Sequence, residues 1–454
     1  MPGVDTSGQN EAIGDDAGSR SRQVLRLAVP AFLALIAEPL FLLADTAIVG
    51  HLGTASLAGL GLASTILLTA VGLCVFLAYG TTAVVARRLG AGSRAGAIAA
   101  GVDGAWLALI LGGLLAVPLI LAAEPVCRAL GGSGPALSQA VSYLRIAALG
   151  IPPMLVVLAC TGVLRGLQDT RTPLIASIGG FSLNALLNVL FVYGFHWGIA
   201  GSASGTVIAQ SAMAALLIVV LLRFARTESV PLRLHPGGVL AAARDGIPLL
   251  VRTLALRAVL VLTTWVAAGL GVVPLAAYQV SATIWSFLAF ALDAVAIAAQ
   301  ALTGRALGAG DAGETRELTR LMVRWGIWSG AALTVVEALS HRLLPPLFTP
   351  DTAVQEAISV GLLVVAAGQI ISGYVFVIDG VLIGAGDARW LAISMCAVLA
   401  AYVPMALAVR AWAPGGSSGV AWLWAAFTGF MAVRGLLLGV RVRSDAWMVL
   451  GAGR

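Results

Sequence analysis

The chain has 454 residues, of which 59% are hydrophobic and 11% charged. Soluble globular proteins carry roughly 25% charged residues, so the composition excludes an ordinary soluble domain and indicates a membrane protein. All 27 basic residues are arginines, and the net charge of +6 is spread over alternate loops without a basic, aromatic-rich stripe, which argues against nucleic acid as a partner.

In chain order, the first element is a polar, acid-containing segment at 1–24, expected to be a disordered tail. Apolar runs of about 20 residues follow, the length that crosses a hydrocarbon core of roughly 30 Å. The expected spans are 25–48, 56–82, 97–121, 140–164, 173–194, 199–222, 247–268, 275–303, 322–343, 357–383, 390–410 and 419–440. The predicted fold class is therefore an all-α polytopic membrane protein with twelve transmembrane helices.

The loop arginines alternate between the two sides of the membrane. With these spans, 21 arginines fall on one side and 4 on the other, which leaves Arg252 and Arg257 in the seventh span. Loops rich in arginine stay in the cytoplasm, so the sequence predicts cytoplasmic termini and a multi-pass protein of the bacterial inner membrane.

The sequence also repeats itself, because the shift that places Pro30 on Pro248 superposes several other landmarks without a gap. Six helices per half give the halves one orientation and a pseudo-symmetry axis along the membrane normal. The further landmarks matched by this repeat offset are the Leu-Gly-Ala-Gly turns at 89–92 and 307–310 and the segments 162–171 and 380–389. The expected parts are a tail at 1–24, six-helix lobes at 25–222 and 247–442, a cytoplasmic linker at 223–246, and a cytoplasmic tail at 443–454.

Ionisable residues within spans are costly to insert, which makes them candidates for function. Glu38 and Asp45 lie two turns apart on one face of the first helix, about 10 Å apart along its axis, and no basic residue lies near them on that helix. A carboxylate there can carry a proton or bind Na⁺. The structural alternative is an ion pair of Asp45 with Arg145, which enters the fourth span at a similar depth.

The second half offers a different pattern, since Arg257 and Asp293 lie at matched depth on adjacent spans. We expect them to form an ion pair with each other, although both remain cavity candidates. Asp379 and Arg252 lie near the cytoplasmic boundary, where long side chains reach the interface. Glu337, close to the outer boundary, is a weaker candidate.

Pro30 cannot donate a backbone hydrogen bond, so it either starts the first helix or kinks it. A kink would make it a hinge linking Asp45 to the shape of the cavity. Asn184 and Asn188 lie one turn apart on the fifth span, and Thr206 lies on the sixth; these side chains either join a polar site or tie helices together.

Several classes of function lack support in the sequence. No Walker A lysine is present, so ATP is not expected to drive the protein, and no H-E-x-x-H or G-x-S-x-G motif indicates an enzyme. The sequence predicts no cofactor and no metal site, and no potassium-filter sequence favours a channel.

Three stretches carry a resemblance to a known family: 44–53 (ADTAIVGHLG), 162–173 (GVLRGLQDTRTP) and 183–188 (LNALLN). Together with the repeated turns, they resemble the multidrug and toxic compound extrusion (MATE) transporters, in the branch named after the DNA-damage-inducible F protein. The resemblance implies two six-helix lobes around a central cavity, with Asp45 as the coupling acid, Pro30 as the bending proline, and Asn188 and Thr206 in the polar cluster. Some relatives carry a second acid where this chain has Val192, and its loss weakens a Na⁺ site.

The predicted function is therefore secondary active export of organic, cationic amphipathic compounds by cation antiport, with H⁺ preferred over Na⁺. Expected partners are small organic substrates and membrane lipid, for a monomeric protein that is not an enzyme. The alternatives are a flippase for lipid-linked precursors, which would expose Arg252 and Arg257 to a lateral opening, and a passive channel or receptor-like protein.

Overall fold

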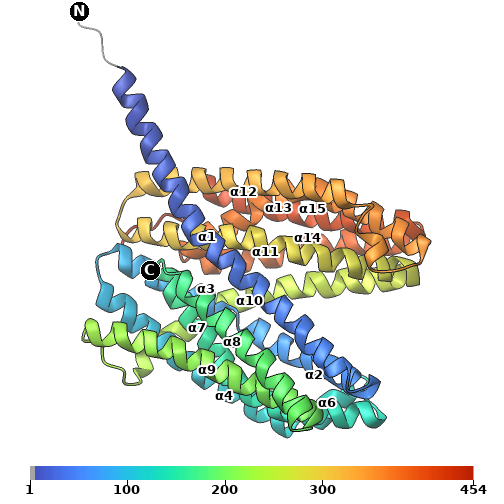
Figure 1. The fold of residues 1–454 in the computed structure, drawn as a ribbon. Helices are drawn as coiled ribbons and strands as arrows, with labels where there is room; N and C mark the ends of the chain where they lie inside the picture. The colour runs from blue at the N-terminus through green and yellow to red at the C-terminus, as the bar shows by residue number, and fades with distance from the viewer. Residues whose placement is uncertain (1–5, 453–454) are drawn as a thin grey trace, which may run out of the picture.

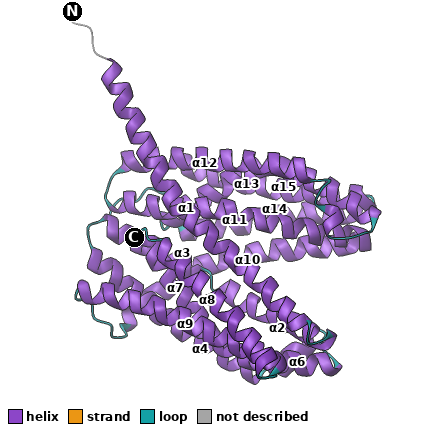
Figure 2. Ribbon diagram, viewed as in Figure 1, coloured by secondary structure: helices purple, strands orange, loops and turns teal. Residues whose placement is uncertain are grey.

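The computed structural model describes residues 6–452, and its regular elements in that range are all helices (Figure 2). The first half contains α1 (Thr6–Gly50), α2 (Thr54–Leu73), α3 (Phe76–Gly90), α4 (Arg94–Leu121), α5 (Ala123–Ala129), α6 (Gly134–Ala147), α7 (Ile151–Gly166), α8 (Arg171–Val189) and α9 (Gly198–Thr227). The second half contains α10 (Pro236–Leu270), α11 (Val272–Gly308), α12 (Ala312–Ser340), α13 (Thr352–Gly384), α14 (Ala388–Trp412) and α15 (Gly416–Arg443). This confirms the all-α prediction.

Eleven helical segments of the described chain are long and apolar enough to cross a membrane. Two of the expected spans are interrupted: α2 and α3 share one, and α6 and α7 share another through the 3-10 turn Ala148–Gly150. The remaining expected span, α12, falls outside this set because Arg316, Arg320 and Arg324 lie in its first half and Glu337 near its end. It nevertheless packs along α11 and α13 and completes the second group of helices.

The repeat persists in the backbone conformation. Left-handed residues, where glycine is favoured, recur at the repeat offset, at the starts of helices and in turns. The pairs are Gly53 with Gly271 (φ 115° and 120°), Gly92 with Gly310 (77° and 78°), Gln168 with Gly386 (64° and 72°), and Gly198 with Gly416 (59° and 69°). Equivalent turns therefore connect equivalent helices in both lobes.

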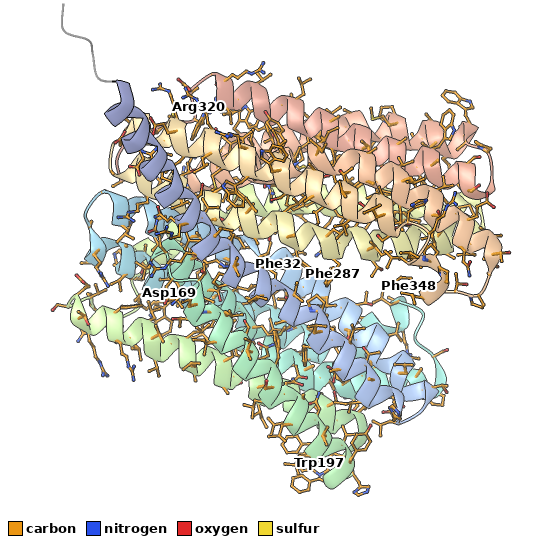
Figure 3. All side chains as sticks on the ribbon, turned by 45° about the horizontal axis from the view of Figure 1, so that its top comes forward. Phe32, Asp169, Trp197, Phe287, Arg320 and Phe348 are labelled. Atoms are coloured by element: carbon orange, nitrogen blue, oxygen red, sulfur yellow. The ribbon has the colours of Figure 1, made fainter. Side chains whose placement is uncertain are left out.

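The two lobes converge at one end of the molecule and diverge at the other (Figure 1). Asp169 and Arg320 lie toward the converged end, which we call the arginine-rich end, and Phe348 lies toward the opposite end (Figure 3). At the convergence α3 crosses α11, where a Cβ on Gly90 would collide with the carbonyl oxygen of Arg305 and a Cβ on Gly308 with that of Arg87. Glycine thus permits direct backbone contact between the lobes.

Helix α1 differs from its expected boundary, because it begins at Thr6 rather than at residue 25. No proline interrupts the chain between Thr6 and Val29, which permits the helix to continue through this polar segment. Residues 1–5 of the expected disordered tail lie outside the described part of the chain. An ion pair between Arg20 and Glu317 of α12 joins this helix to the second lobe.

The connection between the lobes is also shorter than the expected linker at 223–246. Helix α9 continues to Thr227, and α10 begins at Pro236 instead of residue 247. Proline fits the first turn of a helix, and the His235 side chain caps that turn by accepting a hydrogen bond from the Gly238 N–H at 3.1 Å.

The segment after α15 docks on the arginine-rich end. Trp447 is only 2% exposed, and the Gly451 N–H donates to the carbonyl oxygen of Leu307 at 2.9 Å. Arg87 of the first lobe donates to the carbonyl oxygens of Val449 and, at 3.1 Å, Gly451. The C-terminal segment therefore contacts both lobes.

Candidate functional site

The centre of the candidate site is Asp45, a carboxyl group only 4% exposed near the end of α1. Its Oδ1 accepts hydrogen bonds from Asn188 Nδ2 at 2.7 Å and from Ser202 Oγ at 2.6 Å. Its Oδ2 accepts a longer one from the Tyr143 hydroxyl at 3.5 Å. Helices α1, α6, α8 and α9 thus all contribute to one carboxyl group.

A second pair of polar residues lies beside this group. Asn184 Nδ2 donates to Thr206 Oγ1 at 3.0 Å, one turn along α8 and α9 from the Asp45 contacts. The side-chain oxygens of Asn184 and Asn188 are buried and have no hydrogen-bond partner among the described residues. The structure therefore gathers Asp45, Asn184, Asn188 and Thr206, as the resemblance implies, and leaves two amide oxygens available.

Gly205 makes room for this arrangement. A Cβ at position 205 would overlap Asn188 Oδ1, so only glycine allows that amide to sit against α9 while its nitrogen reaches Asp45. The close approach of α8 and α9 follows, as is usual for small residues at membrane helix contacts.

Two members of the site, Tyr143 and Ser202, were not predicted. Ser202 precedes Thr206 by four residues and therefore shares its helix face, a signal that was present in the sequence. Tyr143 lies two residues before Arg145, and the expected depth was right, but the helix rotation puts the tyrosine rather than the arginine toward Asp45.

The expected alternative, an ion pair of Asp45 with Arg145, is not formed. Arg145 is exposed and lines an outer hollow with Glu124, Ser138 and Ser142. Among the described residues, Asp45 has hydrogen-bond donors but no cationic partner. No arginine of the described chain therefore neutralises a negative charge on Asp45.

Glu38 remains exposed, although it lies on the first helix. It follows Ala31 by seven residues and shares its face, and Ala31 packs against Ala294 and Ile297 of α11. The side chain of Glu38 thus lies on the α1 face that is directed at the other lobe. Phe32 of α1 and Phe287 of α11 mark this region between the two helices (Figure 3).

The predicted pair of Arg257 with Asp293 is also absent. Arg257 is exposed and its guanidinium reaches Gly72 at the end of α2 in the first lobe. The charges that act on Asp293 are instead those of Arg165 and Arg252, with Asp379 nearby. Matched depth on neighbouring helices did not determine which faces meet.

The Asp379 side chain does not extend to an exposed surface but lies in a buried charge cluster. It pairs with Arg252, and its Oδ1 lies 2.9 Å from Arg434 Nη2. All three side chains are buried. Two arginines around one aspartate hold α10, α13 and α15 together with an excess positive charge.

Pro30 lies inside α1, far from its start, so the interpretation as a helix-start proline is wrong. Its missing N–H frees the carbonyl oxygen of Arg26, which accepts a long hydrogen bond from Thr170 Oγ1 at 3.5 Å. A second proline, Pro39, lies in the same helix between Glu38 and Asp45. The bending of α1 remains a prediction.

The second lobe has no acid equivalent to Asp45. The repeat offset places Asp45 on Thr263, whose hydroxyl lies 2.7 Å from that of Tyr402. The positions equivalent to Ser202 and Thr206 are the buried Val420 and Trp424. The polar site is therefore a property of the first lobe alone.

Two like-oriented helical lobes, a buried polar site around an acid of the first lobe, and a closed contact at one end define a class of protein, the polytopic membrane transporters. The sequence assigns it more narrowly. A profile of the MatE family matches residues 30–190 and 248–407, two segments that begin at the equivalent prolines of the repeat. The chain belongs to the MatE family of transporters, and it is not an enzyme.

Relatives of known name agree with this membership. The chain is 31% identical to Protein DETOXIFICATION 44, chloroplastic, of Arabidopsis thaliana, over 95% of this chain and 84% of the relative. It is also 31% identical to DNA damage-inducible protein F of Escherichia coli, over 92% of this chain and 91% of the relative. The predicted resemblance to this branch is confirmed.

Solved structures show the same fold. A Vibrio cholerae MATE transporter superposes with a TM-score of 0.86 at 22% identity, covering 95% of this chain and 99% of the other. A MOP superfamily transporter from Pyrococcus furiosus gives 0.83 at 21% identity, covering 94% and 96%.

Proposed function

We propose that this protein exports organic, cationic amphipathic compounds in exchange for protons. The observation that carries the proposal is Asp45, a buried acid surrounded by hydroxyl and amide groups with no cation paired to it among the described residues. An intramembrane acid without a fixed counter-ion is the group whose charge an incoming proton can cancel.

Protons are favoured over Na⁺ by what surrounds the site. Na⁺ would use Asp45 and the free oxygens of Asn184 and Asn188, but Val192, where some MATE relatives have a second acid, is a buried apolar side chain. One carboxylate offers little charge to replace the hydration shell of a metal ion, whereas it is enough to hold a proton.

The class of substrate follows from the α1 face between the lobes. Glu38 provides an exposed carboxyl group there, and Phe287, 45% exposed, provides an aromatic surface. A cation with an apolar body fits both, since carboxylates and aromatic faces attract cations.

The side to which this conformation opens follows from the closed arginine-rich end, which we assign to the cytoplasm from the arginine distribution. In this conformation the lobes diverge toward the outside (Figure 1). Separation of the lobes at Gly90 and Gly308 would expose the opposite side of the site. We assign the protein, as a monomer, to a bacterial inner membrane with cytoplasmic termini.

The flippase alternative loses its main support. It called for both Arg252 and Arg257 to be exposed to a wide lateral opening; Arg257 is exposed, but Arg252 is buried in its pair with Asp379. No feature of the described residues favours a channel over a transporter.

The test uses purified protein in lipid vesicles, a fluorescent organic cation, and pH and Na⁺ gradients imposed separately. We expect accumulation to follow the pH gradient and to be lost in Asp45→Asn. Glu124→Gln, which removes an exposed acid paired with Arg128, is the matched control and should transport normally. Accumulation that follows only the Na⁺ gradient, or an Asp45→Asn variant as active as the parent, would refute proton coupling at this site.

A further inference from the structure

A second acid, Glu337, is buried in the other lobe. It lies on α12 and is 1% exposed, as is Gln369 of α13, whose Nε2 donates to Glu337 Oε2 at 3.0 Å. This pair lies in the half of the second lobe remote from the arginine-rich end, and no residue described above as part of the Asp45 site contacts it.

The two other side-chain oxygens of the pair have no partner. Glu337 Oε1 and Gln369 Oε1 are both buried and accept no hydrogen bond from any described group. If Glu337 were ionised, two acceptors and a full negative charge would be left unsatisfied in an apolar bundle, which native structures avoid.

No cation of the described chain compensates such a charge. The helices packed against α12 are α11 and α13. Along α13 there is no charged residue between Glu356 and Asp379, and along α11 there is none before Asp293. On α12 and just beyond it the nearest ionisable groups are Arg324, His341 and Arg342, and none of them forms an ion pair with Glu337.

A single proton resolves all three deficits. A carboxylic acid and a primary amide pair through two parallel hydrogen bonds, N–H to one acid oxygen and acid O–H to the amide oxygen. The first of these is the contact from Gln369 to Glu337. A proton on Glu337 Oε1 would supply the second and would satisfy both free oxygens while removing the charge.

We propose that Glu337 and Gln369 form a proton-binding site in the second lobe, in which Glu337 is the neutral acid and donates to Gln369 Oε1. The site is built differently from that of Asp45, whose two oxygens already accept from three donors and so tolerate a negative charge. Each lobe then holds one buried acid that has no cationic partner among the described residues, Asp45 in the first lobe and Glu337 in the second.

Infrared difference spectroscopy of the protein in lipid at neutral pH tests this. Glu337→Gln keeps the shape and replaces the acid by an amide, so the C=O stretch of one protonated carboxyl group should disappear from the spectrum. Glu356→Gln, which removes an exposed acid of α13, is the control and should leave that band unchanged. Loss of carboxylate bands instead of the acid band would overturn the proposal.

Gln369→Leu gives a second measurement that does not remove the acid. The same band should remain and move to higher frequency, because the carbonyl loses its hydrogen-bond donor. If the band that is lost in Glu337→Gln appears or vanishes with Na⁺ at constant pH in the parent protein, a metal ion occupies the site, which also contradicts the proposal. None of these readouts requires transport, so they are independent of the proposed coupling at Asp45.

Discussion

Arg87 of α3 and Arg305 of α11 occupy equivalent positions of the repeat, and each donates a hydrogen bond to a loop of the opposite lobe. Arg87 Nη1 reaches the carbonyl oxygen of Ala385 at 2.5 Å, and Arg305 Nη1 reaches Gln168 Oε1 at 2.8 Å. The repeat therefore supplies a reciprocal pair of bonds across the lobe interface. The C-terminal segment breaks the symmetry, because it accepts hydrogen bonds from Arg87 and, within the described part of the chain, none from Arg305.

Arg87→Ala should loosen the arginine-rich end more than Arg305→Ala. Arg87 loses bonds to three carbonyl oxygens, whereas Arg305 loses the one to Gln168. A hydrogen bond to a charged group contributes about 1.5 to 3 kcal/mol, so the population with separated lobes should rise at least about tenfold. Electron paramagnetic resonance distances between labels at positions 171 and 320 would measure it, and equal distance distributions for the two variants would contradict this ranking.

Alanine at Gly90 or Gly308 should also force the lobes apart at that end. The new Cβ meets backbone atoms of Arg305 or Arg87, which cannot move aside as a flexible side chain would. Gly113→Ala is the control, since no atom lies within 4 Å of a Cβ there. Helix propensity alone predicts that the control gains up to about 1 kcal/mol. Thermal unfolding and the same label distances should separate the gain in helix propensity from the backbone clash. A Gly90→Ala protein whose lobes stay closed would disprove the contact between Gly90 and the Arg305 backbone.

Gly205→Ala should impair transport without removing any polar group. Its Cβ would displace the Asn188 amide and break the 2.7 Å bond to Asp45. We expect a loss of at least about tenfold, equivalent to about 1.4 kcal/mol. Gly179→Ala on α8, where a Cβ meets open space, should transport normally in the same vesicle assay. Equal activity of both variants would show that the Asn188 contact is dispensable.

Asp379→Asn should destabilise the second lobe. It leaves Arg252 and Arg434 buried without a full negative partner, and breaking a buried ion pair costs about 3 to 5 kcal/mol. Replacement of all three residues by apolar ones of similar size (Arg252→Met, Asp379→Leu, Arg434→Met) should recover much of the loss. Unfolding temperatures of the parent, Asp379→Asn and the triple variant in detergent would measure both effects. An unchanged unfolding temperature for Asp379→Asn would mean that water already solvates the charge cluster.

Pro30→Ala should restore a backbone donor to the Arg26 carbonyl oxygen and stiffen α1. Proline inside a helix costs about 3 kcal/mol, so we expect higher thermal stability together with slower transport. If Pro30 is only a tolerated irregularity, the variant will be more stable and transport equally fast.

Much of the architecture was predictable because it depends on local rules. Hydropathy identified the helices, and a constant offset between matched landmarks identified the repeat, since a membrane requires long apolar runs and equivalent turns reuse glycine at Gly92 and Gly310. The span expected at 322–343 lies mostly within α12, which is less apolar than the other spans because of its arginines and which packs against α11 and α13.

The sequence by itself determined that Asp45, Asn184, Asn188 and Thr206 are polar residues that a bilayer must accommodate. Only the tertiary structure decided their partners, because spacing gives depth along a helix but not rotation between helices. That rotation brought Tyr143 rather than Arg145 to Asp45. It also paired Glu337 with Gln369, 32 residues away, a contact that no local pattern encodes.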